Sequence, residues 1–183
     1  MNTAIKFLNA WKKAVNEHKE ELKKKWQNPT EFTNFIKGDN GTIIFDVARE
    51  LKLECYPKDY YFIDALLYKK EDIVDGVVAN TFGITGISVA FEHENKFDKH
   101  LYTETCKMLT VCADLKVIVT YPQGPIGYKP TDTVMDFIHT IIKSSRHGDQ
   151  ISELENLLFI FGYQSDFEWE GYVFKKEGWK QIG

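Results

Sequence analysis

One short stretch of the sequence, residues 86–96, joins an apolar run to a dense group of polar side chains. It reads Gly-Ile-Ser-Val-Ala-Phe-Glu-His-Glu-Asn-Lys, with β-branched and aromatic residues at alternate positions. This alternation predicts a buried strand whose successive side chains point to opposite faces of a sheet. One face then carries small and polar residues, namely Ser88, Ala90, Glu92, Glu94 and Lys96. Two carboxylates on one face of a core strand repel each other, so we expect a cation between them.

A second apolar stretch, residues 60–68, carries a single acid, Asp64, in its middle. Its aromatic and aliphatic composition predicts a strand. An acid inside such a strand must be paired, hydrogen-bonded or bound to a metal to stay charged. Neighbouring strands lie about 4.8 Å apart, so Asp64 can meet Glu92 or Glu94 if the two strands are adjacent in the right register.

Carboxylates, the backbone carbonyl of a residue such as His93, and water are hard oxygen ligands. They suit Mg²⁺ or Mn²⁺ and not Zn²⁺. A nearby lysine, such as Lys96, can orient or deprotonate an attacking water and stabilise negative charge on a phosphoryl group. This set of groups predicts metal-assisted hydrolysis of phosphodiester bonds. The His93 side chain points away from the acids by strand alternation, and we expect it to belong to the core.

The remaining apolar patterns predict an α/β fold, with a mixed central sheet flanked by helices on both faces. Periodicity predicts a first helix of roughly 22 residues that stops before Pro29. Further helices are expected over 30–37, from residue 42 to about residue 51, after the N-cap Asp98, and from about residue 131 to 148. Strands are expected over 60–68, 77–82, 84–95, 116–122 and 157–162, with a closing hairpin over 167–182.

An acid in an apolar strand, a second apolar strand running into Glu-x-Glu-x-Lys, a helix and another apolar strand together resemble the PD-(D/E)xK nuclease superfamily. The resemblance covers about residues 42–122 and implies a restriction-endonuclease-like αβββαβ core. N-terminal helices and a C-terminal α/β extension would complete a single domain over 1–183. It implies a nuclease that depends on Mg²⁺ (or Mn²⁺) and hydrolyses DNA in restriction, repair or mobile-element defence. Many nucleases of this fold dimerise to cut two strands, which adds a homodimer to the expectations.

The resemblance carries over to individual residues in two ways. Asp64 matches the first metal-binding acid of the family in both. In one alignment, residues 94–96 are the (D/E)xK motif and Glu92 is an added acid. In the other, which we favour, residues 92–94 take that place and a glutamate stands where the family has lysine. Lys96, or Lys107 from the following helix, would then supply the amine. The sequence departs from the family pattern because no proline precedes Asp64.

Composition sets limits on these expectations. The net charge of −4 gives no overall electrostatic footprint for nucleic acid, although it does not exclude a local basic surface. The three cysteines form no CxxC motif and sit among apolar residues, which favours reduced thiols and a cytoplasmic location. There is neither a secretory signal nor an apolar run of about 18 residues, so no membrane partner is expected.

Two other hypotheses keep the same residues but change their meaning. The first is a catalytically inactive restriction-endonuclease-like protein with an interaction or regulatory role. The second is purely structural, with Glu92, Glu94, Lys96 and Lys99 forming salt bridges at a solvent-exposed strand end. The structural hypothesis predicts that Asp64 lies far from Glu92 and shares no concave site with it.

Overall fold

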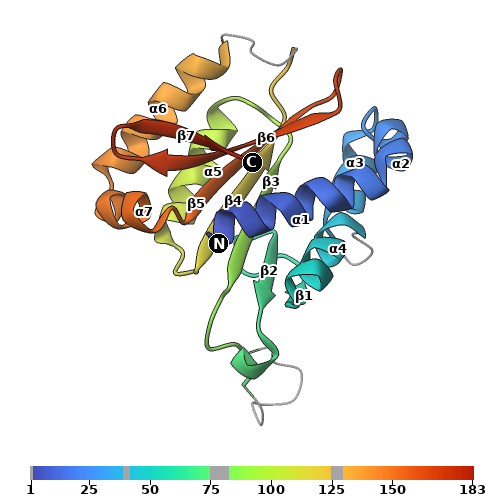
Figure 1. The fold of residues 1–183 in the computed structure, drawn as a ribbon, viewed down its shortest axis with the longest axis horizontal. Coiled ribbons are helices and arrows are strands. Elements are labelled where there is room, and N and C mark those ends of the chain that lie inside the picture. The colour runs from blue at the N-terminus through green and yellow to red at the C-terminus, as the bar shows by residue number, and fades with distance from the viewer. Residues whose placement is uncertain (1, 39–41, 75–82, 125–129) are drawn as a thin grey trace.

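The computed structural model describes residues 2–38, 42–74, 83–124 and 130–183. Within these residues the fold is α/β, with one mixed sheet of seven strands and helices on both of its faces (Figure 1). The helices are α1 (Thr3–Glu17), α2 (Lys19–Lys25), α3 (Pro29–Ile36), α4 (Thr42–Leu51), α5 (Lys99–Thr110), α6 (Pro130–Ser144) and α7 (Gly148–Leu154), with a 3₁₀ turn, η1, at Lys70–Asp72. The strands are β1 (Glu54–Tyr56), β2 (Ala65–Tyr68), β3 (Val89–Glu94), β4 (Leu115–Thr120), β5 (Leu157–Tyr163), β6 (Glu168–Lys175) and β7 (Gly178–Ile182).

The strands lie side by side in the same order as in the sequence, from β1 to β7. The three strands β3, β4 and β5 run parallel, whereas the pairs on either side of them are antiparallel. Parallel neighbours need a crossover connection, which α5 supplies between β3 and β4 and α6 with α7 between β4 and β5. The expectation that residues 116–122 form a central strand is confirmed, since β4 is fourth of the seven.

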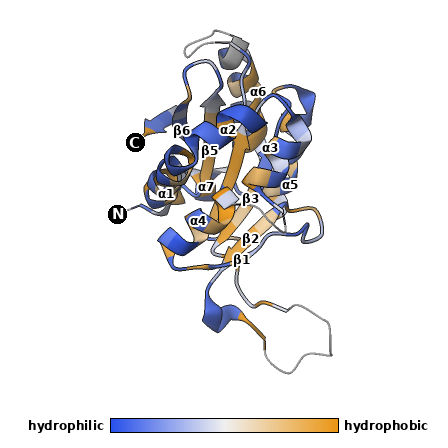
Figure 2. Cartoon of the chain, turned by 90° about the vertical axis from the view of Figure 1, so that its right-hand side faces the viewer, coloured by the Kyte–Doolittle hydropathy of each residue, from blue (hydrophilic) through white to orange (hydrophobic). Residues whose placement is uncertain are grey.

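Two hydrophobic clusters cover the two faces of this sheet. Side chains of α1, α3 and α4 pack on one face with Val89 and Phe91 of β3, and α5, α6 and α7 pack on the other with Ala90. Figure 1 shows α1 lying across the first face with α5 behind the strands, and Figure 2 shows the apolar strands between helices with polar outer surfaces. The predicted alternation along β3 is therefore confirmed. None of the helices in the described ranges is long and apolar enough to cross a membrane.

The predicted first helix is wrong in one respect, because it is broken at His18 into α1 and α2. His18 leaves helical geometry, with φ −108° and ψ 20°. Its Nε2 atom lies 2.7 Å from Oδ2 of Asp46 on α4, and its ring packs edge-on against Phe35 on α3. These contacts with the neighbouring helices accompany the change of direction, after which Trp26 stacks on Phe32.

The strand predicted over 60–68 is shorter than expected and begins at Ala65. Residues 60–63 instead form a tight turn, in which the amides and carbonyls of Tyr60 and Ile63 bond to each other at 2.9 and 3.1 Å. Tyr61 has a left-handed backbone with φ 59°, which cannot continue a strand. The sequence did not predict β1, and the strand predicted at 77–82 lies outside the described residues. The elements from α4 to β4 nevertheless follow the order αβββαβ.

Candidate functional site

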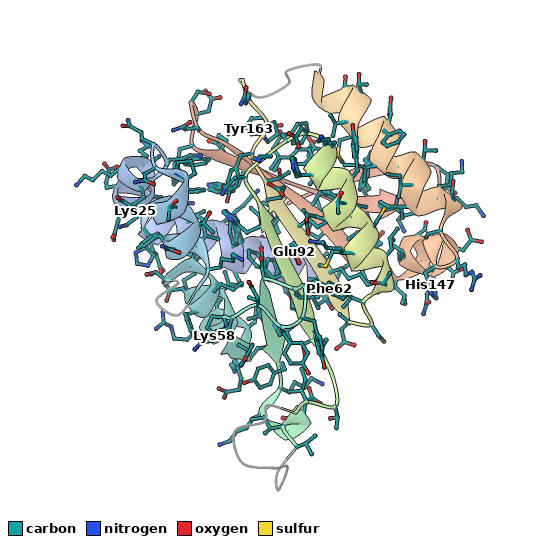
Figure 3. All side chains as sticks on the ribbon, turned by 180° about the vertical axis from the view of Figure 1, so that it is seen from behind. Lys25, Lys58, Phe62, Glu92, His147 and Tyr163 are labelled. Carbon is teal, nitrogen blue, oxygen red and sulfur yellow. The ribbon has the colours of Figure 1, made fainter. Side chains whose placement is uncertain are left out.

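The register of β2 and β3 places Asp64 opposite Glu92. The last pair of the ladder is Ala65 with Phe91, so the next positions along the two strands are Asp64 and Glu92. Directly opposite residues of antiparallel strands have Cβ atoms about 5 Å apart on the same face. Both acids line one pocket of about 240 Å³ beside α5, where β2 begins and β3 ends. Figure 3 shows Glu92 beside α5, with Phe62 near it.

Glu92 is the most unusual group in this pocket. Only 4% of the residue is exposed, and its Oε1 atom is buried with no hydrogen-bond partner among the described residues. Burial, followed by the negative charges of Asp64 and Glu104, raises the pKa of Glu92 from 4.5 to about 9. The Glu92 carboxyl is therefore neutral at pH 7 unless a cation replaces its proton. This burial contradicts the structural hypothesis of a solvent-exposed strand end.

Asp64 is held by two donors, as its position beside apolar strands requires. The backbone amide of His93 donates to Oδ2 at 2.8 Å, and the ammonium of Lys37 contacts Oδ1. Lys37 is the C-terminal cap of α3 and also lies 3.5 Å from Asp59. The sequence did not predict a role for Lys37, because no motif links the end of α3 to β2.

The middle of α5 adds a further acid, Glu104, and an amine, Lys107, to the pocket. The helix begins after Asp98, whose side chain accepts from the His100 amide as predicted for an N-cap. The Lys107 ammonium lies 2.8 Å from each carboxylate oxygen of Glu104. This contact, together with the charges of Glu104, Glu92 and Asp64, raises the pKa of Lys107. The i,i+3 spacing of Glu104 and Lys107 is that of an ordinary helix ion pair, so the sequence alone does not place Glu104 in the site.

Glu94 and Lys96 have different positions. Glu94 is the last residue of β3 and lines the pocket, where its Oε1 accepts from the Lys96 amide at 2.7 Å. Lys96 follows the end of the strand and is exposed, and it is not among the residues that line the pocket. The face alternation predicted through residue 96 therefore stops at Glu94. The structure brings together Asp64, Glu92, Glu94 and Lys107, with Lys37 at Asp64, but not Lys96.

His93 points to the opposite face of the sheet, as predicted. Its ring is buried between Phe32 and Tyr121, with Nε2 2.7 Å from the Tyr121 hydroxyl oxygen. Burial, with a smaller effect from the charge of Lys37, lowers the pKa of His93 to about 3. The His93 side chain is thus a neutral core group, as expected. The role of its backbone carbonyl as a metal ligand stays a prediction.

Two exposed aromatic residues form the rim of the pocket. Tyr61 is 86% exposed and Phe62 is 47% exposed, although both are large and apolar. The left-handed backbone of Tyr61 belongs to the turn of residues 60–63, which two backbone hydrogen bonds close. The ring of Tyr60 packs edge-on against the ring of Tyr61, with 5.0 Å between the ring centroids. The turn therefore fixes an aromatic side chain in solvent beside the acids. The sequence offered no sign of this rim, since 60–68 reads as one strand.

The chemistry of these groups fits a hard divalent cation. In the parts of the chain that the structure describes, no three His, Cys, Asp or Glu side chains form a ready-made metal site. Mg²⁺, however, keeps several waters and is commonly held by only one or two carboxylates together with substrate phosphate. Asp64 and Glu92 supply such a pair, and the buried Oε1 of Glu92 has no hydrogen-bond partner within the described part of the chain. Acids also outnumber amines in the pocket, which favours a cation there.

Comparison of the sequence with models of known protein families finds no match, and comparison with curated proteins finds none either. The resemblance to PD-(D/E)xK nucleases thus depends on the residues and on the order of the elements described above.

Proposed function

We propose that the protein is a metal-dependent nuclease of the PD-(D/E)xK type that hydrolyses phosphodiester bonds in DNA. The observation that carries this proposal is the pair of Asp64 and Glu92 at adjacent strands, with one buried carboxylate oxygen that no described residue hydrogen-bonds. Keeping like charges together in a buried position costs stability, and a bound cation removes that cost. A cytoplasmic location and a homodimer remain parts of the proposal.

Asp64 and Glu92 are the groups that would hold Mg²⁺ or Mn²⁺, with Glu94 and the His93 carbonyl as further oxygen ligands. When bound, the ion would polarise a phosphoryl oxygen and acidify a water molecule. Because Glu92 lies opposite Asp64, this proposal aligns residues 92–94 with the (D/E)xK motif. Glu94 then occupies the position of the family lysine.

The working amine in this proposal is Lys37 or Lys107. Lys37 already donates to Asp64, so its ammonium is positioned at the acid that a substrate phosphate must approach. Lys107 is held by both oxygens of Glu104 and is less free to move. Either ammonium can orient a water molecule and stabilise negative charge on the phosphate. Lys96 is exposed and outside the pocket, so we assign it no role in the chemistry.

The rim of the pocket supports nucleic acid as the substrate class. Aromatic side chains bind unpaired bases by stacking, at about 1–3 kcal/mol per base, without regard to sequence. Tyr61 and Phe62 present such side chains within the same pocket as the acids. A strand whose phosphate enters the pocket can place a neighbouring base on this rim.

The test combines metal titration with a cleavage assay. Calorimetric titration of the wild-type protein with Mn²⁺ should give a binding heat, and Asp64→Ala and Glu92→Ala should each lose it. In a Mg²⁺-dependent assay over single-stranded, double-stranded and branched DNA and RNA, the same variants should lose more than about 100-fold in rate, because outer partners of metal ligands already contribute 10- to 100-fold. Glu50→Ala is the matched control, since Glu50 is an exposed acid on α4 that pairs with Lys13 outside the pocket. Absence of Mn²⁺ binding in the wild type would refute the metal site.

A catalytically inactive relative with a binding or regulatory role is the second candidate. The contact of Lys37 with Asp64 favours it, because an internal ammonium already neutralises one of the two acids. Under this hypothesis the wild-type protein cleaves none of the substrates, whether or not it binds Mn²⁺.

A further inference from the structure

A second largely buried titratable residue lies on the same face of the sheet as Glu92, toward the opposite end of α5. Lys116 is the second residue of β4 and pairs with Ala90 of β3 and Leu157 of β5. Only 5% of the residue is exposed. Among the described residues, no carboxylate pairs with its ammonium and no hydrogen-bond partner for it is found. Its Nζ atom is not among the fully buried polar atoms without a partner, so the ammonium at the end of this largely buried side chain keeps access to solvent. A cation in such a position, with no counter-charge beside it, favours an anion as its partner.

Lys116 lines a cavity of about 170 Å³ that is separate from the acidic pocket. The wall comprises the C-terminal end of α5 with the loop after it, the start of α7, and the residue before β5. Its members are Leu109, Thr110, Val111, Cys112, Ala113, Lys116, His147, Gln150, Ile151 and Asn156. Figure 3 shows His147 on the far side of α5 from Glu92. No Asp or Glu is found in this lining, in contrast to the acidic pocket.

The cavity also contains a buried acceptor without a partner. The Oδ1 atom of Asn156 is buried and accepts no hydrogen bond from any described residue. Its backbone is fixed, because the Lys116 amide donates to the Asn156 carbonyl at 2.9 Å. The space exceeds what one water molecule needs, so a small polyatomic ligand can enter.

We propose that this cavity binds a small oxyanion that carries a hydroxyl group, of the phosphate type. The oxyanion accepts a charge-assisted hydrogen bond from the Lys116 ammonium, while its P–OH group donates to Asn156 Oδ1. His147 and Gln150 are exposed at the mouth and offer further polar contacts. Burial lowers the pKa of Lys116, and a bound anion would oppose that shift. Inorganic phosphate keeps a P–OH group at pH 7, whereas a nucleoside monophosphate carries one only in its monoanion, below a second pKa of about 6. The inference does not depend on the proposed nuclease function.

The experiment is calorimetric titration at pH 7 with EDTA present, so that no metal at the acidic pocket can bind phosphate. The probes are inorganic phosphate, sulfate and a nucleoside 5′-monophosphate. Phosphate should bind the wild-type protein, and Lys116→Met should weaken it at least tenfold. Sulfate lacks a hydroxyl and should bind at least fivefold more weakly than phosphate. Lys24→Met, at an exposed lysine of α2, should leave both affinities unchanged.

Two results would overturn the proposal: equal phosphate binding by wild type and Lys116→Met, or equal binding of sulfate and phosphate. Tighter binding of the monophosphate than of phosphate identifies a phosphomonoester as the ligand, and the reverse identifies the free ion.

A second measurement uses only the wild-type protein, so it does not depend on whether Lys116→Met folds. Phosphate should slow modification of Lys116 by an amine-reactive reagent, read by mass spectrometry, while Lys24 reacts equally in both conditions. Absence of protection at Lys116 contradicts the proposal.

Discussion

Glu92 and His93 are consecutive residues of β3 that project to opposite faces of the sheet, and their surroundings are instructive to compare. Both are buried, with 4% and 7% of each residue exposed. Each also has one buried polar atom without a hydrogen-bond partner among the described residues, Oε1 in Glu92 and Nδ1 in His93. Burial shifts both pKa values toward the neutral form, to about 9 for Glu92 and about 3 for His93.

The difference lies in what surrounds each group. His93 sits within a shell of aromatic rings and contacts the Tyr121 hydroxyl, so nothing in its environment calls for a charge. Glu92 faces a pocket that it shares with Asp64, Glu94, Glu104 and Lys107. Burial alone therefore does not mark a functional group. A site is indicated where a buried titratable group meets like charges and an opening to solvent.

The largest expected effect is a gain of stability in Glu92→Gln. A carboxyl whose pKa is raised on folding stabilises the fold fully below its unfolded pKa of 4.5, and this stability is lost as the pH rises toward 9. At pH 7 the loss amounts to about 3 kcal/mol, which the neutral isostere avoids. Urea unfolding in EDTA from pH 5 to 9 should show a falling free energy of unfolding for the wild type and a nearly flat one for the variant.

A divalent cation should reverse this difference in stability between the wild-type protein and Glu92→Gln. Mn²⁺ binds the ionised carboxylates, so it should raise the melting temperature of the wild-type protein most strongly at pH 8 to 9 and leave Glu92→Gln almost unchanged. Equal stabilisation of both proteins by Mn²⁺ would show that the ion binds elsewhere.

His93→Gln should change the pH dependence of the free energy of unfolding on the acid side, and by less than Glu92→Gln changes it on the alkaline side. A histidine whose pKa is lowered on folding contributes stability above its unfolded pKa of 6.5, which is lost as the pH falls toward 3. Between pH 6.5 and 5 the wild-type protein should lose about 2 kcal/mol through this group. The variant should lack that slope, although lost ring packing lowers its stability at every pH.

His147→Gln is the control for this measurement, because His147 is exposed. It should reproduce the wild-type slope below pH 6.5. A slope of the same size in His93→Gln would mean that another group causes the acid sensitivity. Neither histidine variant should alter Mn²⁺ binding, since the His93 ring and the acids lie on opposite faces of β3.

The sequence was sufficient to predict the class of fold, the alternation along β3 and the meeting of Asp64 with the Glu92 region. These features follow from patterns within single strands, where side chains alternate with a period of two. The exact register was not predictable, because the length of β2 depends on the left-handed turn at Tyr61. The broken first helix likewise depends on a contact between His18 and Asp46, which are 28 residues apart.

The roles of Lys37 and Glu104 in the site could not be predicted for a related reason. Lys37 reaches Asp64 only because α3 ends beside β2 in the folded chain. Glu104 and Lys107 form an i,i+3 pair that in a sequence looks like any surface ion pair of a helix. Which face of α5 turns toward the sheet is decided by the packing of Leu101, Thr105 and Met108. That orientation also brings Glu104 and Lys107 to the pocket.

The smallest effect that we predict concerns the aromatic rim of the acidic pocket. It tests whether a nucleic acid binds on the face of β3 that carries Glu92. Tyr61→Ala should weaken binding of a single-stranded oligonucleotide about tenfold, in line with the loss of one base stacked on an aromatic ring. Fluorescence anisotropy in Ca²⁺ would measure the affinity. Phe137→Ala is the matched control, because Phe137 on α6 is also exposed, at 51%, but does not line the pocket. Equal losses in the two variants would indicate nonspecific contact with exposed aromatic residues. If only Tyr61→Ala loses affinity, and duplex DNA binds less tightly than the single strand, then the Glu92 face of β3 binds an unpaired nucleotide.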